Sequence, residues 1–291
     1  MHMLSQFNVR NFFPFQIFLF IFFIPTVSVQ AKEPVRFGVL SIAPPARIHA
    51  KWQPFVRYVS KQLGHEVKII VPRGFKKMKA AAASGAIDFF YVNSHVFYRL
   101  KQKGKAIGVA QMENISGLTT STSDIFVRSD SDIKKVEQLK GKSIAFVSRM
   151  GAGGYLAPRA YLYGKGVKTK SQTKELFTKN LSSSIHKVLL GEINAGTMCG
   201  VNYKLLGKKM DTGELRVIGQ SSPYPENVIA ARSTIDKKLM HKFKEVIISM
   251  PDSVEGQKVL TLMHSLKIKR FLPYDVNSET LTKKLLYMAE F

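Results

Sequence analysis

The chain alternates short apolar runs with amphipathic segments over most of its length. Residues 35–40, 67–71 and 86–92 are compact apolar runs, which are typical of buried strands. Between the first two runs, residues 52–63 place apolar side chains at helical spacing, and residues 75–84 form an alanine-rich segment. Short loops that join a strand, a helix and a strand predict parallel strands with crossover helices. We expect a helix over 94–103, capped by Ser94, to follow the third strand.

The pattern changes at residues 111–128, which are extended, weakly periodic and rich in Ser and Thr. A second α/β series follows, and then a second extended stretch at 215–231 that contains two prolines. Two such series joined by two extended crossings predict an α/β protein with two lobes and a ligand cleft between them. The predicted elements of the second half are helices over 133–139, 155–165, 182–190, 236–249, 253–265 and 278–289, with strands over 143–147 and 193–198.

The order of these elements also predicts the domain boundaries. Residues 32–121 and 226–291 form lobe 1, which is discontinuous in sequence, and residues 122–225 form lobe 2. The N-terminus is predicted to be a separate segment. Residues 12–24 are almost entirely apolar, Arg10 precedes them, and small residues flank Gln30 at the end of the segment. This pattern predicts a signal peptide over 1–31 that is cleaved after Ala31.

A membrane anchor is the alternative for the N-terminal segment. Its apolar run is shorter than the roughly 20 residues that span a bilayer, and Pro14, Gln16 and Pro25 interrupt or bound it. We therefore expect a periplasmic protein that has lost this segment.

Composition narrows the classes of function. Lys and Arg number 44 against 20 Asp and Glu, so the formal net charge is +24. The basic residues are spread over helix ends and loops without interleaved aromatic residues, so we expect no nucleic-acid partner. The electric field of this net positive charge can attract anionic solutes or hold the protein near anionic lipid surfaces. The single cysteine, Cys199, excludes an internal disulfide, and no metal-binding or catalytic motif is present, so we expect no metal, cofactor or catalytic residue.

A glycine-rich turn is the most informative motif. It runs from Ser148 through Gly151, Ala152 and Gly153 to Gly154, after a predicted strand and before a predicted helix. Small residues there let backbone N–H groups converge on an anion, and the helix N-terminus adds partial positive charge. The alternative is a tight turn from strand to helix that contacts no ligand.

Polar residues at the end of the third predicted strand form a second candidate group. Tyr91, Asn93, Ser94 and His95 lie where the strands of an open sheet face a ligand. The alternative is that Ser94 only caps the next helix and Tyr91 belongs to the core. Further along the chain, His186 lies one turn into a helix that we expect Ser182 or Ser183 to cap.

Several motifs, in order, carry a resemblance to a known family. They are the segments 84–88, 130–142, 154–159, 191–196 and 221–225. This set resembles the phosphate/phosphite/phosphonate substrate-binding proteins of ABC importers. The resemblance implies a two-lobed type II periplasmic-binding-protein fold without enzymatic activity, in which a small anionic solute is held between the lobes and delivered to a membrane permease.

The resemblance also assigns roles to particular residues. It implies that His186 hydrogen-bonds ligand oxygens. The family often has Ser-Thr-Ser where this chain has Gly151-Ala152-Gly153, so those hydroxyl groups are missing here. We expect a monomeric importer component, and the alternative is a periplasmic receptor that presents its ligand state to a membrane sensor kinase.

Overall fold

The computed structural model describes residues 33–40 and 44–290, so the predicted signal peptide lies outside the described residues. The strands are β1 (Val35–Val39), β2 (Val67–Ile70), β3 (Phe89–Val92), β4 (Ala106–Asn114), β5 (Thr120–Ser121), β6 (Ser123–Arg128), β7 (Ser143–Phe146), β8 (Lys174–Phe177), β9 (Ala195–Cys199), β10 (Leu215–Gln220), β11 (Tyr224–Pro225), β12 (Val228–Arg232) and β13 (Ile268–Pro273). The α-helices are α1 (Pro45–Leu63), α2 (Gly74–Ser84), α3 (Ser94–Lys101), α4 (Ala157–Gly164), α5 (Thr169–Gln172), α6 (Leu181–Leu189), α7 (Gly200–Gly207), α8 (Lys237–Ile248), α9 (Val254–Met263) and α10 (Asn277–Met288).

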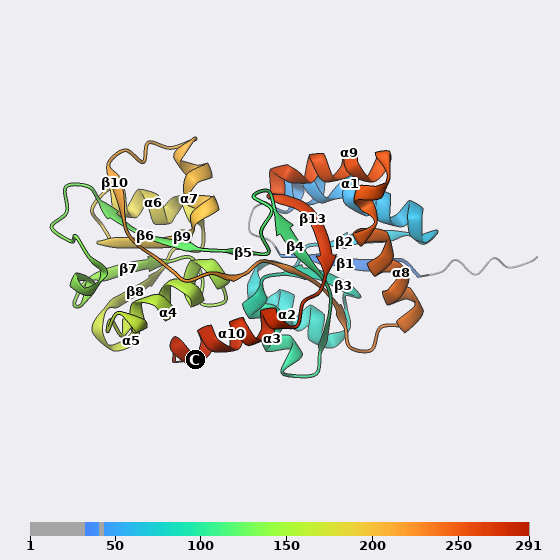
Figure 1. Cartoon of the computed structure of the whole chain (residues 1–291), viewed down its shortest axis with the longest axis horizontal. Coiled ribbons are helices and arrows are strands. Elements are labelled where there is room, and N and C mark those ends of the chain that lie inside the picture. Colours follow the sequence, from blue (N-terminus) through green and yellow to red (C-terminus); the bar gives the residue numbers. More distant parts are fainter. Residues whose placement is uncertain (1–32, 41–43, 291) are drawn as a thin grey trace, which may run out of the picture. The chain divides into compact units, whose positions relative to one another are not determined.

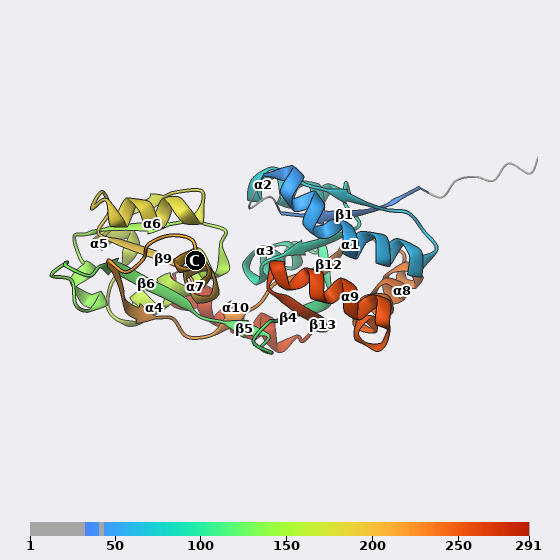
Figure 2. The ribbon, with the colours of Figure 1, turned by 90° about the horizontal axis from the view of Figure 1, so that it is seen from above.

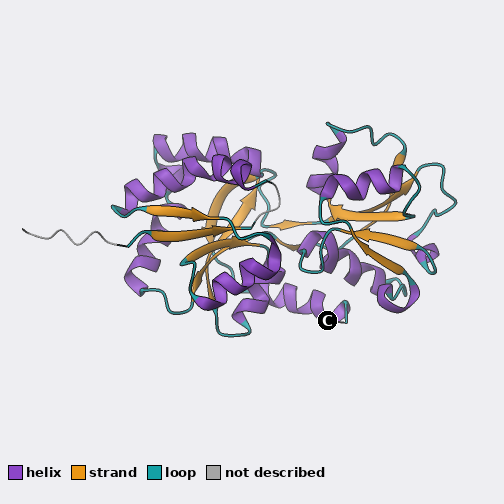
Figure 3. Ribbon diagram, turned by 180° about the vertical axis from the view of Figure 1, so that it is seen from behind, coloured by secondary structure: helices purple, strands orange, loops and turns teal. Residues whose placement is uncertain are grey.

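Two mixed sheets organise these elements into two lobes (Figures 1 and 3). The sheet of lobe 1 has the strand order β13-β4-β12-β3-β1-β2. The sheet of lobe 2 has the order β10-β6-β9-β7-β8. In lobe 1, β1 pairs in parallel with both β2 and β3, as the sequence predicts, whereas β12 runs antiparallel to β3 and β4.

Aromatic packing fixes α1 on the sheet of lobe 1. The ring of Phe37 on β1 lies 5.4 Å from that of Trp52 and 5.3 Å from that of Phe55, measured between centroids. All three side chains are buried, and each contributes about 1.5–3 kcal/mol by leaving water. The helical spacing of these apolar residues in the sequence therefore marks a genuine core face.

A short ribbon joins the lobes. β5 and β11 pair antiparallel, with Tyr224 opposite Ser121. Outside this pair, the backbone N–H of Ser221 donates to the Ser123 carbonyl at 2.8 Å, and that of Glu226 donates to the Thr119 carbonyl at 2.9 Å. The two crossing segments, far apart in sequence, thus run side by side (Figure 2).

The last helix is a further link between the lobes. α10 packs on α3 and α4, and its apolar face joins Leu285 and Leu286 to Leu156. Lys101 of α3 makes an ion pair with Glu279, and Arg159 of α4 donates from Nε to the Ala289 carbonyl at 2.9 Å. The C-terminal segment therefore contacts both lobes.

Several local predictions were wrong. α1 begins at Pro45, ahead of the predicted helical segment 52–63, because Pro45 fits the first turn of a helix, where no backbone N–H partner is needed. The helix expected over 133–139 is only a 3₁₀ turn, η1 (Val136–Leu139).

The helix caps also differ from the prediction. Asn93, not Ser94, caps α3, and Asn180, not Ser182 or Ser183, caps α6. In each case an asparagine one to three residues earlier supplies the side-chain oxygen that accepts the free N–H. α5, β8, α7 and β13 were not predicted. Within the described residues, no helix is long and apolar enough to cross a membrane.

Candidate functional site

The residues after β3 connect lobe 1 to the glycine-rich turn. Asn93 Oδ1 accepts from the Val96 backbone N–H at 2.9 Å, while its Nδ2 donates to the Met150 carbonyl at 3.1 Å. Ser94 is buried, and its Oγ donates to the Pro225 carbonyl of the ribbon at 3.0 Å. The structure thus brings together two candidate segments that lie more than fifty residues apart in sequence.

Tyr91 and His95 lie in different surroundings. The Tyr91 ring is 4.8 Å from the Trp52 ring, its hydroxyl donates to the Met112 sulfur at 2.9 Å, and burial raises its pKa. This contact set belongs to the packing of lobe 1. His95 is 1% exposed, and burial, followed by the nearby charges of Arg99 and Lys79, lowers its pKa to about 4. His95 is therefore neutral at pH 7 and lies near the cations of α2 and α3.

The glycine-rich turn opens as predicted but continues into a π-helical turn, η2 (Ala152–Leu156), before α4. The Ser148 carbonyl accepts from the Gly151 backbone N–H at 3.0 Å. Two carbonyls of the turn are also used: Gly153 accepts from Ser123 Oγ at 2.6 Å, and Gly154 accepts from Thr197 Oγ1 at 3.2 Å. The first N–H groups of a helix have no partner within it, so η2 supplies backbone donors at its start.

Gly153 has a packing role that the sequence did not show. A Cβ atom at this position would lie 2.6 Å from Tyr224 Cζ, closer still to the Tyr224 hydroxyl, and 3.2 Å from Cys199 Cβ. Only a residue without a side chain permits this approach of the turn to the ribbon.

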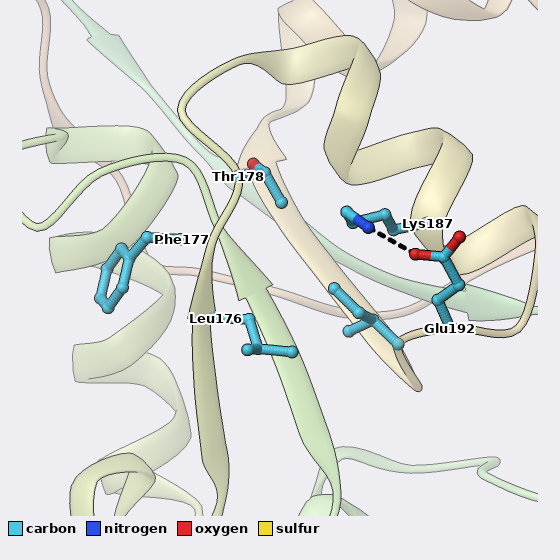
Figure 4. Close-up of a pocket in the computed structure, with 6 residues that line it drawn as sticks. Leu176, Phe177, Thr178, Lys187 and Glu192 are labelled. Carbon is cyan, nitrogen blue, oxygen red and sulfur yellow. Dashed lines mark hydrogen bonds and ion pairs between the residues drawn. The ribbon is translucent and has the colours of Figure 1, made fainter.

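His186 lies apart from these residues. It is exposed on α6, and no hydrogen bond or ion pair within residues 33–40 and 44–290 joins its side chain to the turn or to the end of β3. A cavity of about 210 Å³ near α6 is lined by Thr178, Lys187 and Glu192 among others, and Lys187 and Glu192 form an ion pair there (Figure 4). None of the predicted site residues lines this cavity.

Four residues near the turn were not predicted as site residues: Cys199, Tyr224, Glu226 and Lys267. Tyr224 is buried, and burial together with nearby Cys199 and Glu226 raises its pKa well above the usual range. Glu226 Oε1 accepts from Asn114 Nδ2 at 3.0 Å and from the Ser121 hydroxyl. The carboxylate at this end of the ribbon is therefore well satisfied.

Lys267 brings a positive charge to the same neighbourhood. It precedes β13 with φ of 66°, and its carbonyl accepts from the Ile115 backbone N–H at 3.1 Å. Burial lowers its pKa, Lys51 lowers it further, and Cys199 and Glu226 act in the opposite direction. None of the ion pairs found in the described part of the chain includes Lys267.

The register of β13 explains why the sequence did not reveal Lys267. Ile268 pairs with Asn114, and this places Lys267 beside the residues that lead into the ribbon. Nothing in the local sequence marks this lysine among its basic neighbours Lys269 and Arg270. No cluster of three or more potential metal ligands occurs among the described residues.

Comparison with known sequences decides the family. Residues 37–279 match the family described as ABC transporter, phosphonate, periplasmic substrate-binding protein. The chain belongs to this family. Its members are binding proteins rather than enzymes. This confirms the family, the fold and the absence of enzymatic activity that the sequence motifs indicated.

The relatives of this family member include both an import protein and a sensor kinase. It is 21% identical to the phosphate-import protein PhnD of Mycolicibacterium smegmatis over 234 residues, which cover 75% of this chain and 72% of that protein. It is 27% identical to the tetrathionate sensor histidine kinase TtrS of Salmonella typhimurium over 145 residues, or 48% of this chain. That match spans only 24% of the kinase.

Among solved structures, PhnD1 of Prochlorococcus marinus in complex with methylphosphonate superposes with a TM-score of 0.74 at 19% identity. The superposition covers 88% of this chain and 98% of that one, and at this identity it shows the shared fold.

Proposed function

We propose that this family member binds a small oxyanion-bearing solute, phosphate-like or phosphonate-like, between its two lobes and delivers it to an ABC permease. The observation that carries the proposal is the Lys267 ammonium group. Lys267 is partly buried, none of the ion pairs among the described residues includes it, and Cys199 and Glu226 act on it electrostatically. Cys199 in turn lies close to Gly153 of the glycine-rich turn. Partial burial of a cation costs free energy, and a nearby anion offsets this cost.

The donors around Lys267 suit a tetrahedral oxyanion. The turn contributes backbone N–H groups at the start of η2, and the ammonium group contributes a full positive charge. Together they compensate for the hydroxyl groups that the family often has at Gly151-Ala152-Gly153. Asn114 and Ser121 hold the Glu226 carboxylate in place but do not cancel a carboxylate's charge, so the ammonium group of Lys267 is the group that offsets it for an incoming anion.

Ligand binding would favour closure of the lobes if each lobe contacts the ligand. Lys267 belongs to lobe 1 and the glycine-rich turn to lobe 2, so one ligand that touches both stabilises the closed arrangement. The β5–β11 ribbon is the natural hinge. We expect a smaller radius of gyration by small-angle scattering at saturating ligand.

Calorimetry on the mature protein tests the proposal. Phosphate, phosphite and methylphosphonate are titrated in turn, with acetate as the comparison anion. Lys267→Met should weaken binding of the best of these anions by about 10- to 100-fold, as expected for the loss of a charge-assisted hydrogen bond. Lys283→Met, which removes the same charge from an exposed position on α10, is the matched control and should bind like the native protein. Native affinity in Lys267→Met would refute the role of this lysine, and no binding of any oxyanion would refute the proposed function.

A sensory role is the second candidate, because the match to the TtrS kinase covers nearly half of this chain. The two functions differ in what deletion of the gene does. Loss of uptake of the labelled solute supports transport, whereas normal uptake with loss of a solute-induced transcriptional response supports sensing.

A further inference from the structure

A basic groove lies between α2 and α3 of lobe 1, away from the ligand site proposed above. It encloses about 500 Å³, and its lining residues are Lys76, Lys79, Ala80, Ala83, Arg99, Leu100 and Lys103. Four of these seven residues are cationic and none is acidic. The other three are apolar. We name this feature the α2–α3 groove; the two helices that form it are labelled in Figure 1.

All charged residues in the two segments that flank the groove are basic. Residues 73–86 contain Arg73, Lys76, Lys77 and Lys79, and residues 94–105 contain Arg99, Lys101, Lys103 and Lys105, with no Asp or Glu in either segment. Like charges at helical spacing destabilise a helix. An anionic ligand relieves this repulsion, so the arrangement favours one.

The potential of the groove acts on a neighbouring buried group. Burial lowers the pKa of His95 on α3, and the charges of Arg99 and Lys79 lower it further. The positive charges of Arg99 and Lys79 therefore both reach the same region of α3. An anion in the groove would be attracted by both of them.

The dimensions of the groove distinguish between classes of anionic partner. A volume of about 500 Å³ falls within the range of small-molecule sites, whereas a protein partner needs a broader surface of about 800 Å² on each side. A lining that combines four cations with the apolar side chains of Ala80, Ala83 and Leu100 fits a phosphate attached to a short carbon skeleton. A phospholipid headgroup has this chemistry, and a protein of net charge +24 is attracted to surfaces that display it.

We propose that the α2–α3 groove binds the phosphate headgroups of an anionic membrane surface and holds the protein there with its ligand site free. Lys79 and Arg99, both half-buried, lie inside the groove, while Lys76 and Lys103 are exposed at its rim. Headgroup phosphates meet the rim first and the inner pair on deeper contact.

Vesicle sedimentation of the mature protein tests this. The vesicles are phosphatidylcholine alone or phosphatidylcholine with phosphatidylglycerol. Each basic residue near an anionic surface contributes about a factor of five to binding, so Lys79→Gln with Arg99→Gln should lower the partition coefficient about 30-fold. The rim pair Lys76→Gln with Lys103→Gln should act in the same way and involves only exposed side chains, so a folding defect in the first variant does not remove the test.

A matched pair controls for net charge. Lys237→Gln with Lys238→Gln removes the same two charges from exposed positions on α8 and should leave binding to anionic vesicles close to native. Equal losses in the groove pairs and in this pair would overturn the proposal, because total charge alone would then explain binding. Tight binding of soluble glycerol 3-phosphate with no binding to anionic vesicles would also overturn it, since the groove would then be a site for a free organic phosphate.

Discussion

Replacing Gly153 with alanine should destabilise the protein, although the change adds a single methyl group. The added Cβ would lie 2.6 Å from Tyr224 Cζ and 3.2 Å from Cys199 Cβ. Tyr224 is buried in an apolar cluster with Leu285 and Leu286, so its ring has little room to retreat. Overpacking of this kind costs about 1–3 kcal/mol.

The neighbouring glycine provides a matched control. A Cβ at Gly154 would meet only Val147, with its Cβ at 3.4 Å, which is ordinary contact. Gly154→Ala removes conformational freedom from the unfolded chain and should stabilise the protein by about 0.4–1 kcal/mol. The two adjacent glycine-to-alanine changes are therefore expected to have opposite signs and to differ by about 1.4–4 kcal/mol in the free energy of unfolding.

Urea unfolding followed by circular dichroism measures both effects as shifts in midpoint at constant m. In a background with Tyr224→Ala, the cost of Gly153→Ala should fall by more than about 1 kcal/mol, because the two residues are in contact. If Gly153→Ala is as stable as Gly154→Ala, or if the Tyr224 background leaves its cost unchanged, the close approach of turn and ribbon is not as described. A Gly153 variant that loses ligand binding could do so because its packing against Tyr224 is disturbed. Gly154→Ala changes the turn without this packing effect, so its ligand binding reports on the turn itself.

Three further predictions concern pH, a buried ion pair and export. His95 has a pKa of about 4 in the folded protein against 6.5 when unfolded, so the unfolded state binds more protons between these values. Stability should therefore be lost as pH falls from about 6.5 to 4, by up to about 3 kcal/mol, and His95→Gln should remove this part of a pH series of urea midpoints. Arg159→Met should destabilise the protein by about 3–5 kcal/mol, because it leaves the buried Glu175 carboxylate without its buried cation. Adding Glu175→Gln to this variant should recover part of the lost stability, as measured by urea unfolding. If the losses of the two single variants simply add, the ion pair does not contribute in this way. N-terminal sequencing of the protein from the periplasmic fraction should begin at Lys32, and a chain that still carries Met1 would contradict cleavage after Ala31.

The sequence by itself determined the local elements and their pairing in lobe 1. β1, β2 and β3 fall within the predicted apolar runs, and their parallel pairing follows from short loops and crossover helices. Gly64 and Gly85 end α1 and α2 with φ of 63° and 75°, values that glycine adopts readily. The apolar spacing of a helix and a glycine at its C-terminal end depend on residues within one or two turns of chain, so a single sequence contains them.

Only the tertiary structure decided which residues surround the candidate site. Asn93 meets Met150, Gly153 meets Tyr224, and Lys267 reaches the ribbon through the pairing of β13 with β4. The family resemblance assigned His186 to the site. His186 is exposed on α6, and no hydrogen bond or ion pair among the described residues joins its side chain to these residues. Each of these relations joins parts of the chain that are far apart in sequence, and strand register and side-chain packing fix them only when the whole chain has folded.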